Sequence, residues 1–176
     1  MKKILTFAGS NSKNSINKQL AIYAANQVDE AQINVLDLND LDLPLYGIDL
    51  ENDQGIPKDA VKLLGLIKQS DGIVLSLAEH NGAYATAFKN VFDWMSRIDG
   101  KLWSNVPMLL MATSPGARGG ATVLEIAKGR FPYMGGNIVA DFSLPSFMDN
   151  FSEEGIKDES LSKKLEDAIA AFKEAL

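Results

Sequence analysis

The feature that most constrains the fold is a repeated alternation between short apolar runs and longer helical patterns. Five apolar runs have the length of strands: Lys3–Ala8, Ile33–Leu38, Gly72–Ala78, Pro107–Ala112 and Ile138–Phe142. Because these runs are almost continuously apolar, we expect strands that are buried on both faces, as in a parallel sheet. Helical patterns follow them over residues 16–29, 58–69, 84–98, 119–132 and 160–175.

This alternation predicts an α/β fold, an open five-stranded parallel sheet with helices on both faces. The 176 residues suit one domain over residues 1–176, and we find no repeat or interdomain linker. Residues 39–57 form a longer, polar connection. In such sheets, ligands bind beyond the carboxyl ends of the strands, near the point where the strand order reverses. The loops after the first, third and fourth strands therefore form the candidate site.

The composition excludes several classes of function. The chain has no cysteine and a single histidine, His80, so disulfides, thiolate catalysis and sites rich in Cys or His for metals are excluded. Acidic residues outnumber basic ones 23 to 17, which argues against nucleic-acid or membrane-surface partners. The apolar stretch Ile4–Ala8 is shorter than the roughly 7–15 residues of a signal-peptide core. No run approaches the ~20 apolar residues of a membrane span. We expect a cytoplasmic protein.

The loop from Gly9 to Asn17 combines three hydroxyl side chains with the start of a helix. A helix N-terminus presents unpaired N–H groups and a partial positive charge, so it binds phosphate readily. The alternative is that one serine caps the helix and the rest is turn chemistry. The loop lacks both the Walker and the dinucleotide glycine patterns. We assign to a phosphate site Ser10, Ser12, Ser15, Ile16 and Asn17.

The second loop clusters polar groups directly after the third strand. Its residues are Glu79, His80, Asn81 and Gly82, and Tyr84 adds an aromatic surface. Such a loop is able to hold a flat heteroaromatic ring through backbone hydrogen bonds. Ordinary turn chemistry is the alternative.

The third loop, Ala112–Val123, is rich in glycine. We assign to the site Ser114, Gly116, Gly119 and Gly120, because glycine permits close approach of the backbone to a ligand. A degraded nucleophile elbow around Ser114 is rejected. Pro115 lacks the N–H that the oxyanion hole of that motif requires, and His80 precedes the serine, in the wrong order for that hydrolase fold.

Together the three loops resemble the NADPH-dependent FMN reductase family, a flavodoxin-like group that includes quinone, chromate and azo-dye reductases. The family pattern G-S-x-R-x-x-S-x-N is met by Gly9, Ser10, Ser15 and Asn17. A second pattern, P-E-Y-N-x-S-x-P-x-x-L-K-N-x-x-D-W, is met by Glu79, Asn81, Lys89, Asn90, Asp93 and Trp94. Ser12 replaces the usual arginine and His80 the usual tyrosine. The resemblance implies the flavodoxin-like strand order 2-1-3-4-5.

The resemblance also implies a cofactor and a reaction. Residues 9–17 would hold the FMN phosphate, residues 79–82 the isoalloxazine and residues 114–120 its pyrimidine side. NADPH or NADH would reduce FMN, and a small-molecule electron acceptor such as a quinone, flavin or azo compound would then reoxidise it, in a ping-pong sequence. Family members usually form homodimers or homotetramers, with the 84–98 helix near an interface.

Two other functions stay open on the residues alone. The acidic charge and the serine spacing also fit a non-enzymatic electron carrier of flavodoxin type. A member that has lost flavin and serves as an interaction module is a third interpretation. His80 would pack against the flavin or protonate a reduced product. We expect Asp93 and Arg97 to form an i,i+4 surface pair.

Overall fold

The five predicted strands form one parallel sheet in the computed structural model, which describes residues 1–176. They are β1 (Lys2–Gly9), β2 (Ala31–Leu36), β3 (Gly72–Leu77), β6 (Pro107–Thr113) and β7 (Asn137–Leu144). The spatial order is β2-β1-β3-β6-β7, and every neighbouring pair is parallel. For the five long strands this is the predicted flavodoxin-like order 2-1-3-4-5, with its switch point between β1 and β3.

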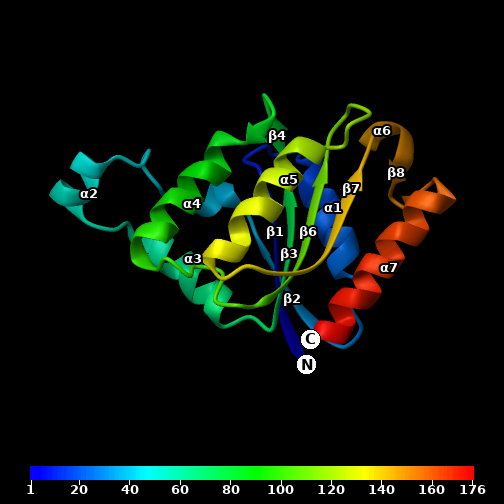
Figure 1. Cartoon of the computed structure of the whole chain (residues 1–176), viewed down its shortest axis with the longest axis horizontal. Helices are drawn as coiled ribbons and strands as arrows, with labels where there is room; N and C mark the ends of the chain where they lie inside the picture. The colour runs from blue at the N-terminus through cyan, green and yellow to red at the C-terminus, as the bar shows by residue number, and fades with distance from the viewer.

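Helices cover both faces of this sheet, as predicted (Figure 1). On one face lie α1 (Ile16–Ala25) and α7 (Glu159–Ala175). On the other face lie α3 (Lys58–Lys68), α4 (Thr86–Ile98) and α5 (Ala121–Arg130). None of the helices combines the length and the apolar character that crossing a bilayer requires.

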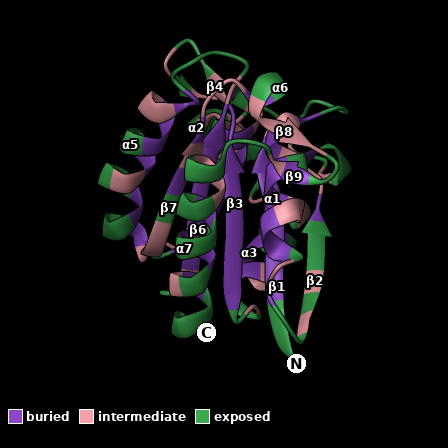
Figure 2. Ribbon diagram, turned by 90° about the vertical axis from the view of Figure 1, so that its right-hand side faces the viewer, coloured by how far each residue is buried: buried purple, intermediate pink, exposed green.

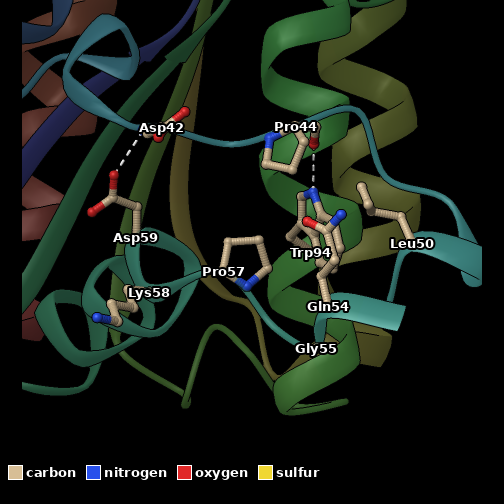
Figure 3. A pocket seen from close by; sticks show the side chains of 9 residues that line it. All are labelled: Asp42, Pro44, Leu50, Gln54, Gly55, Pro57, Lys58, Asp59 and Trp94. Carbon is tan, nitrogen blue, oxygen red and sulfur yellow. Dashed lines mark hydrogen bonds between the residues drawn. The ribbon is translucent and has the colours of Figure 1, made fainter. Parts of the chain in front are cut away.

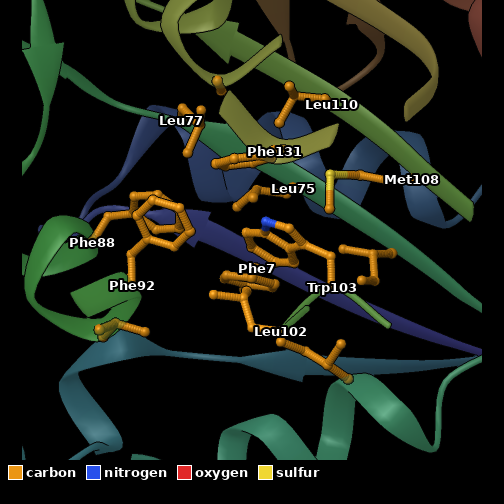
Figure 4. Close-up of a cluster of buried hydrophobic side chains, with 14 of the residues drawn as sticks. Phe7, Leu75, Leu77, Phe88, Phe92, Leu102, Trp103, Met108, Leu110 and Phe131 are labelled. Carbon is orange, nitrogen blue, oxygen red and sulfur yellow. The ribbon is translucent and has the colours of Figure 1, made fainter. Parts of the chain in front are cut away.

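The strand side chains alternate between the two faces and so divide the core. Within β3, Leu75 packs on the α3–α5 side and Val74 on the α1–α7 side. The α3–α5 side carries an aromatic group in which Trp103 and Phe131 have ring centroids 4.6 Å apart (Figure 4). Burying each such ring contributes about 1.5–3 kcal/mol. Trp103 and Trp94 are both fully buried.

Burial on both faces holds for the three inner strands, but the prediction is wrong for the edge strands. Figure 2 shows β3 buried along its length and β2 largely exposed. Val35 of β2 is 43% exposed, and most of β7 is only half-buried. The two edge strands have a neighbour on one side only, so their apolar side chains are less completely covered.

Several short elements had no clear periodic signal. They are η1 (Leu38–Asp40), α2 (Ile48–Gln54), β4 (Glu79–His80), β5 (Ala83–Tyr84), η2 (Phe131–Met134), α6 (Phe147–Asn150), β8 (Phe151–Ser152) and β9 (Gly155–Ile156). Helix α2 lies within the predicted connection 39–57, buries none of its residues and projects away from the sheet (Figure 1). The polar sequence of that connection does not predict this helix, because α2 has no apolar face packed against the core.

The expected pair of Asp93 with Arg97 does not form. Instead Lys89 Nζ lies 2.7 Å from Asp93 Oδ1, and Arg97 Nε lies 2.9 Å from Glu51 Oε2 in α2. Helix α4 thus uses Arg97 to hold the projecting α2 segment, a long-range contact that the local spacing of charges could not reveal.

Candidate functional site

A cavity of about 340 Å³ lies at the carboxyl edge of the sheet, where the loops after β1, β3 and β6 meet. It brings together eight of the predicted site residues: Ser10, Ser12, Ser15, Ile16, Asn17, Glu79, His80 and Ser114. Five further residues line it: Asn14, Ala78, Thr113, Pro115 and Met148. The remaining predicted residues, Asn81, Gly82, Gly116, Gly119 and Gly120, do not line this cavity. Met148 comes from α6, after the fifth strand, and no local sequence signal points to it.

The start of α1 supplies the donors of this cavity. Ser15 is the N-cap, and its Oγ accepts a hydrogen bond from the Lys18 N–H at 3.1 Å. The N–H groups of Ile16 and Asn17 donate to no acceptor in the protein. Ser10 Oγ accepts from the Ser12 N–H at 3.1 Å, so both serines are held in one turn. Hydroxyl and N–H donors at a helix N-terminus suit a phosphate.

The side chain of Asn17 is hydrogen-bonded within the protein. It is buried, and its Oδ1 accepts from Ser76 Oγ at 2.7 Å and from the Thr113 N–H at 3.0 Å. Its Nδ2 donates to the Thr113 carbonyl at 3.1 Å. The amide therefore ties α1 to β3 and β6, and only the backbone N–H of Asn17 remains free to meet a ligand.

The second loop is a β-hairpin rather than an irregular turn. Strands β4 and β5 pair antiparallel, and the turn residues Asn81 and Gly82 have φ values of 52° and 72°. Two consecutive positive φ angles are typical of a type I′ turn, for which Asn-Gly is the preferred sequence. The Asn-Gly dipeptide is the sequence signal that could have predicted this hairpin.

Glu79 anchors the hairpin to α5. Its Oε2 accepts from the Val123 N–H at 2.9 Å, in the first turn of that helix. A carboxylate is favoured at a helix N-terminus, and the N-cap position of α5 is a glycine without a side chain of its own. The Glu79 carboxylate is thus engaged within the protein.

Two of the predicted glycines are explained by packing within the fold. Gly119 and Gly120 have φ values of 57° and 73°. A Cβ on Gly119 would lie 2.6 Å from Ser143 Oγ, and one on Gly120 would lie 2.9 Å from the Ala112 Cβ. A Cβ on Gly116 would meet only Ser114 Oγ, at an ordinary contact distance of 3.9 Å. Close approach of this loop to β6 and β7 therefore accounts for two of the three glycines.

Two ionisable groups near these loops are engaged within the protein. Lys18 Nζ donates to Asp37 Oδ2 at 2.6 Å, and this hydrogen bond lowers the pKa of Asp37. Tyr84 turns into the core, where its ring stacks on Phe131 at 6.3 Å, instead of forming an aromatic surface at the site. Burial raises the pKa of Tyr84 to about 12, and its hydroxyl has no hydrogen-bond partner.

A second cavity, of about 470 Å³, adjoins the first, and His80 lines both. Its other lining residues are Asn11, Leu38, Asn39, Leu41, Leu43, Leu45, Thr86, Ala87, Asn90 and Val91. The leucines belong to the connection after β2, where composition alone predicts only a polar loop. The carboxyl edge therefore offers two adjoining spaces, one lined by hydrogen-bond donors at the start of α1 and one lined by both leucine and uncharged polar side chains.

The sequence profile of the NADPH-dependent FMN reductases matches residues 2–149, which include every loop of the two cavities up to Met148. The chain belongs to this family.

The chain is also similar to individual oxidoreductases. A quinone reductase of Escherichia coli K12 is 32% identical over 120 residues, which cover 68% of this chain and 63% of that protein. An NADPH azoreductase of a Bacillus species is 31% identical over 124 residues, covering 70% and 65%. The match thus spans less than two thirds of the length of these curated relatives. Among solved structures, the flavoenzyme NAD(P)H:(acceptor) oxidoreductase of Paracoccus denitrificans has a TM-score of 0.76, with 26% identity over 99% of this chain and 96% of that one.

The first cavity fits the cofactor of an FMN reductase at its α1 end. The donor set there consists of hydroxyls and free N–H groups. Glu79 is the only carboxylate in the lining, and its hydrogen bond to the Val123 N–H directs it toward α5. A phosphate would therefore meet donors there without a strongly competing negative charge.

Proposed function

We propose that this protein is an FMN-dependent NAD(P)H oxidoreductase that transfers electrons in a ping-pong sequence to a small-molecule acceptor such as a quinone, flavin or azo compound. The observation that carries the proposal is the pair of adjoining cavities that share His80. A cofactor held in the donor-rich cavity leaves the second one open to a reactant. An enzyme with exchanging substrates needs such a space beside its cofactor.

The residues of this chain would bind and orient, while FMN when bound supplies the hydride chemistry. The hydroxyls of Ser10, Ser12 and Ser15 and the N–H groups of Ile16 and Asn17 would hold the phosphate. The backbone of the Glu79–Gly82 hairpin would lie along the ring.

The third loop would bind the pyrimidine side of the ring. The N–H groups of Gly116 and Ala117 donate to no acceptor in the protein, so they are free to do so. Preorganised N–H donors at that edge stabilise negative charge on a reduced ring. Ser114, at the start of this loop, lines the cofactor cavity directly.

Family membership and the reductase names of the relatives support the enzyme over a flavodoxin-type electron carrier. The donor set at the start of α1 argues against the flavin-free interaction module, because a member that no longer binds FMN has no need to retain it. We also propose a cytoplasmic location and a homodimer or homotetramer. The exposed Leu45 and Ile48 of the projecting segment support self-association, which analytical ultracentrifugation would test.

The decisive experiment adds FMN to the purified protein and follows flavin absorbance anaerobically after one equivalent of NADPH, and separately of NADH. We expect rapid bleaching to the two-electron-reduced form by at least one of the two nucleotides. Bound flavin that is bleached only by dithionite, through a semiquinone, would favour the carrier. Failure to bind FMN would contradict both functions.

A further inference from the structure

An extended segment, residues 41–46, lies between η1 and α2 and runs along α4; we call it the strap. Asn90 of α4 binds it three times. The Asn90 Oδ1 accepts from the Tyr46 N–H at 2.8 Å, and its Nδ2 donates to the carbonyls of Pro44 at 3.1 Å and Leu43 at 3.4 Å. The neighbouring Lys89 pairs only with Asp93 and does not touch the strap.

Trp94, one turn further along α4, binds the same segment. Its Nε1 donates to the Pro44 carbonyl at 2.7 Å, and its ring meets that of Tyr46 edge-on at 5.0 Å. Figure 3 shows the indole nitrogen directed at Pro44, and both residues line a further cavity of about 430 Å³. The strap therefore keeps an attachment to α4 even without Asn90.

The strap forms one wall of the second cavity. It contributes Leu41, Leu43 and Leu45, and α4 contributes Ala87 and Val91 opposite. No aspartate, glutamate, lysine or arginine lines this space. Leu45 is 74% exposed at this wall, so its side chain is accessible from the cavity.

We propose that the second cavity is a subsite for the uncharged, apolar ring of an electron acceptor, and that Asn90 is the positioning residue that holds its leucine wall. The inference rests on the proposed function, because His80 joins this cavity to the one assigned to FMN. An anion would lose its hydration there and gain no cationic partner, whereas a neutral ring would bury apolar surface. The subsite therefore discriminates between acceptors by charge.

The test compares two probes that share a ring and differ by one negative charge, 1,4-naphthoquinone and 1,4-naphthoquinone-2-sulfonate. Their affinities for the oxidised, FMN-loaded protein are measured by calorimetry without a nicotinamide, so that no turnover occurs. The chain has no cysteine for a quinone to alkylate. We expect the neutral probe to bind about tenfold more tightly. Equal affinities, or tighter binding of the sulfonate, would overturn the proposal.

Two variants and one control sharpen this test. Leu45→Lys adds a cation at an exposed position without disturbing the core, and we expect it to shift the affinity ratio toward the sulfonate by about tenfold. Asn90→Ala should weaken binding of the neutral probe about fivefold while the affinity for FMN stays unchanged. Lys89→Ala should change neither affinity. An unchanged ratio in Leu45→Lys would contradict the charge selection.

A spectroscopic readout separates positioning by Asn90 from a general loss of structure. Protein labelled with 5-fluorotryptophan gives two 19F resonances, because the chain has two tryptophans. Asn90→Ala should shift the Trp94 resonance, which reports the bond to Pro44, and leave that of the core residue Trp103 in place. In single-turnover reoxidation of dithionite-reduced protein, the same variant should raise the naphthoquinone concentration for half-maximal rate and leave the maximal rate nearly unchanged. A shift of both resonances, or a fall in maximal rate alone, would contradict the positioning role.

The proposed function can fail independently of this inference. Bleaching by NAD(P)H tests the enzyme, whereas the calorimetric experiment uses no nicotinamide. If the protein binds the probes selectively by charge but NAD(P)H does not reduce it, the subsite is supported and the reductase function is contradicted.

Discussion

The loop at the start of α1 and the strap after β2 line adjoining cavities, but they are held in opposite ways. The α1 loop is fixed from inside, through the buried Asn17 amide and its bonds to β3 and β6. The strap is fixed from outside, by Asn90 and Trp94 on α4 and by Asp59 on α3. The helix that follows it, which Arg97 of α4 holds through Glu51, buries no residue. The contrast indicates a rigid cofactor end and a more weakly held wall on the acceptor side.

The largest effect that this contrast predicts follows from Asn17→Ala. The substitution leaves buried polar groups of Ser76 and Thr113 without partners, so we expect a loss of about 3–5 kcal/mol in the free energy of unfolding. Urea denaturation measures it. Asn14→Ala, an exposed change in the same loop, should stay within about 0.5 kcal/mol. If the two variants are equally stable, the buried side chain of Asn17 does not fix the α1 loop.

Gly119→Ala and Gly116→Ala form the next comparison, within the third loop. At Gly119 the added methyl meets Ser143 and the Leu144 backbone, at a positive φ, and we expect a loss of about 2–4 kcal/mol. At Gly116 the methyl has space, so the change should be within about 1 kcal/mol of neutral. Thermal unfolding of both variants tests this. Similar losses of stability in both variants would mean that close packing against β7 is not the reason for a glycine at position 119.

The ion pair of Asp37 with Lys18 gives a smaller effect that depends on pH. Because the hydrogen bond from Lys18 lowers the pKa of Asp37 below its ordinary value, the pair stabilises the fold above that ordinary value. The stabilisation, about 0.5–1 kcal/mol for a partly exposed pair, is lost as pH falls through the lowered pKa. Urea titrations of the wild type and Asp37→Asn from pH 7 to about pH 3 should converge at the acid end. A difference that persists or grows with acidity would contradict the pairing.

Arg97→Ala should give the smallest effect. Its bond to Glu51 is solvent-exposed, so the loss of stability should not exceed about 0.5 kcal/mol, with no change in FMN affinity. Proteolysis should nevertheless cut α2 faster, because this residue holds the projecting segment to α4. If α2 is cut no faster than in the wild type, contacts other than the Arg97–Glu51 pair hold this segment.

Most of the sheet, and the meeting of three loops at its carboxyl edge, follows from local sequence signals. Apolar runs mark the strands, and Ser15 before an apolar helix marks the N-cap that the structure contains. The role of Asn17 could not be predicted, because its partners Ser76 and Thr113 lie 59 and 96 residues away. The sequence indicates a polar residue there, but whether it faces a ligand or the protein depends on tertiary contacts.

The acceptor side was less predictable for the same reason. Asn90 and Trp94 belong to a motif that the family resemblance identifies, yet the resemblance does not say what they touch. Their bonds reach 44 and 50 residues back to Tyr46 and Pro44, in a stretch whose composition predicts only a polar connection. The Asn81-Gly82 turn is different, since that dipeptide is itself a hairpin signal.

The division between the two regions is tested most directly by measuring FMN affinity and naphthoquinone reoxidation in Asn17→Ala and Asn90→Ala side by side. If the cofactor end is rigid and the acceptor wall is separate, each variant should impair only one of the two measured properties. Asn17→Ala should lose FMN affinity about tenfold or more, and Asn90→Ala should keep it but require about fivefold more naphthoquinone. If both variants lose FMN equally, or if neither alters the response to naphthoquinone, the two cavities do not have separate roles.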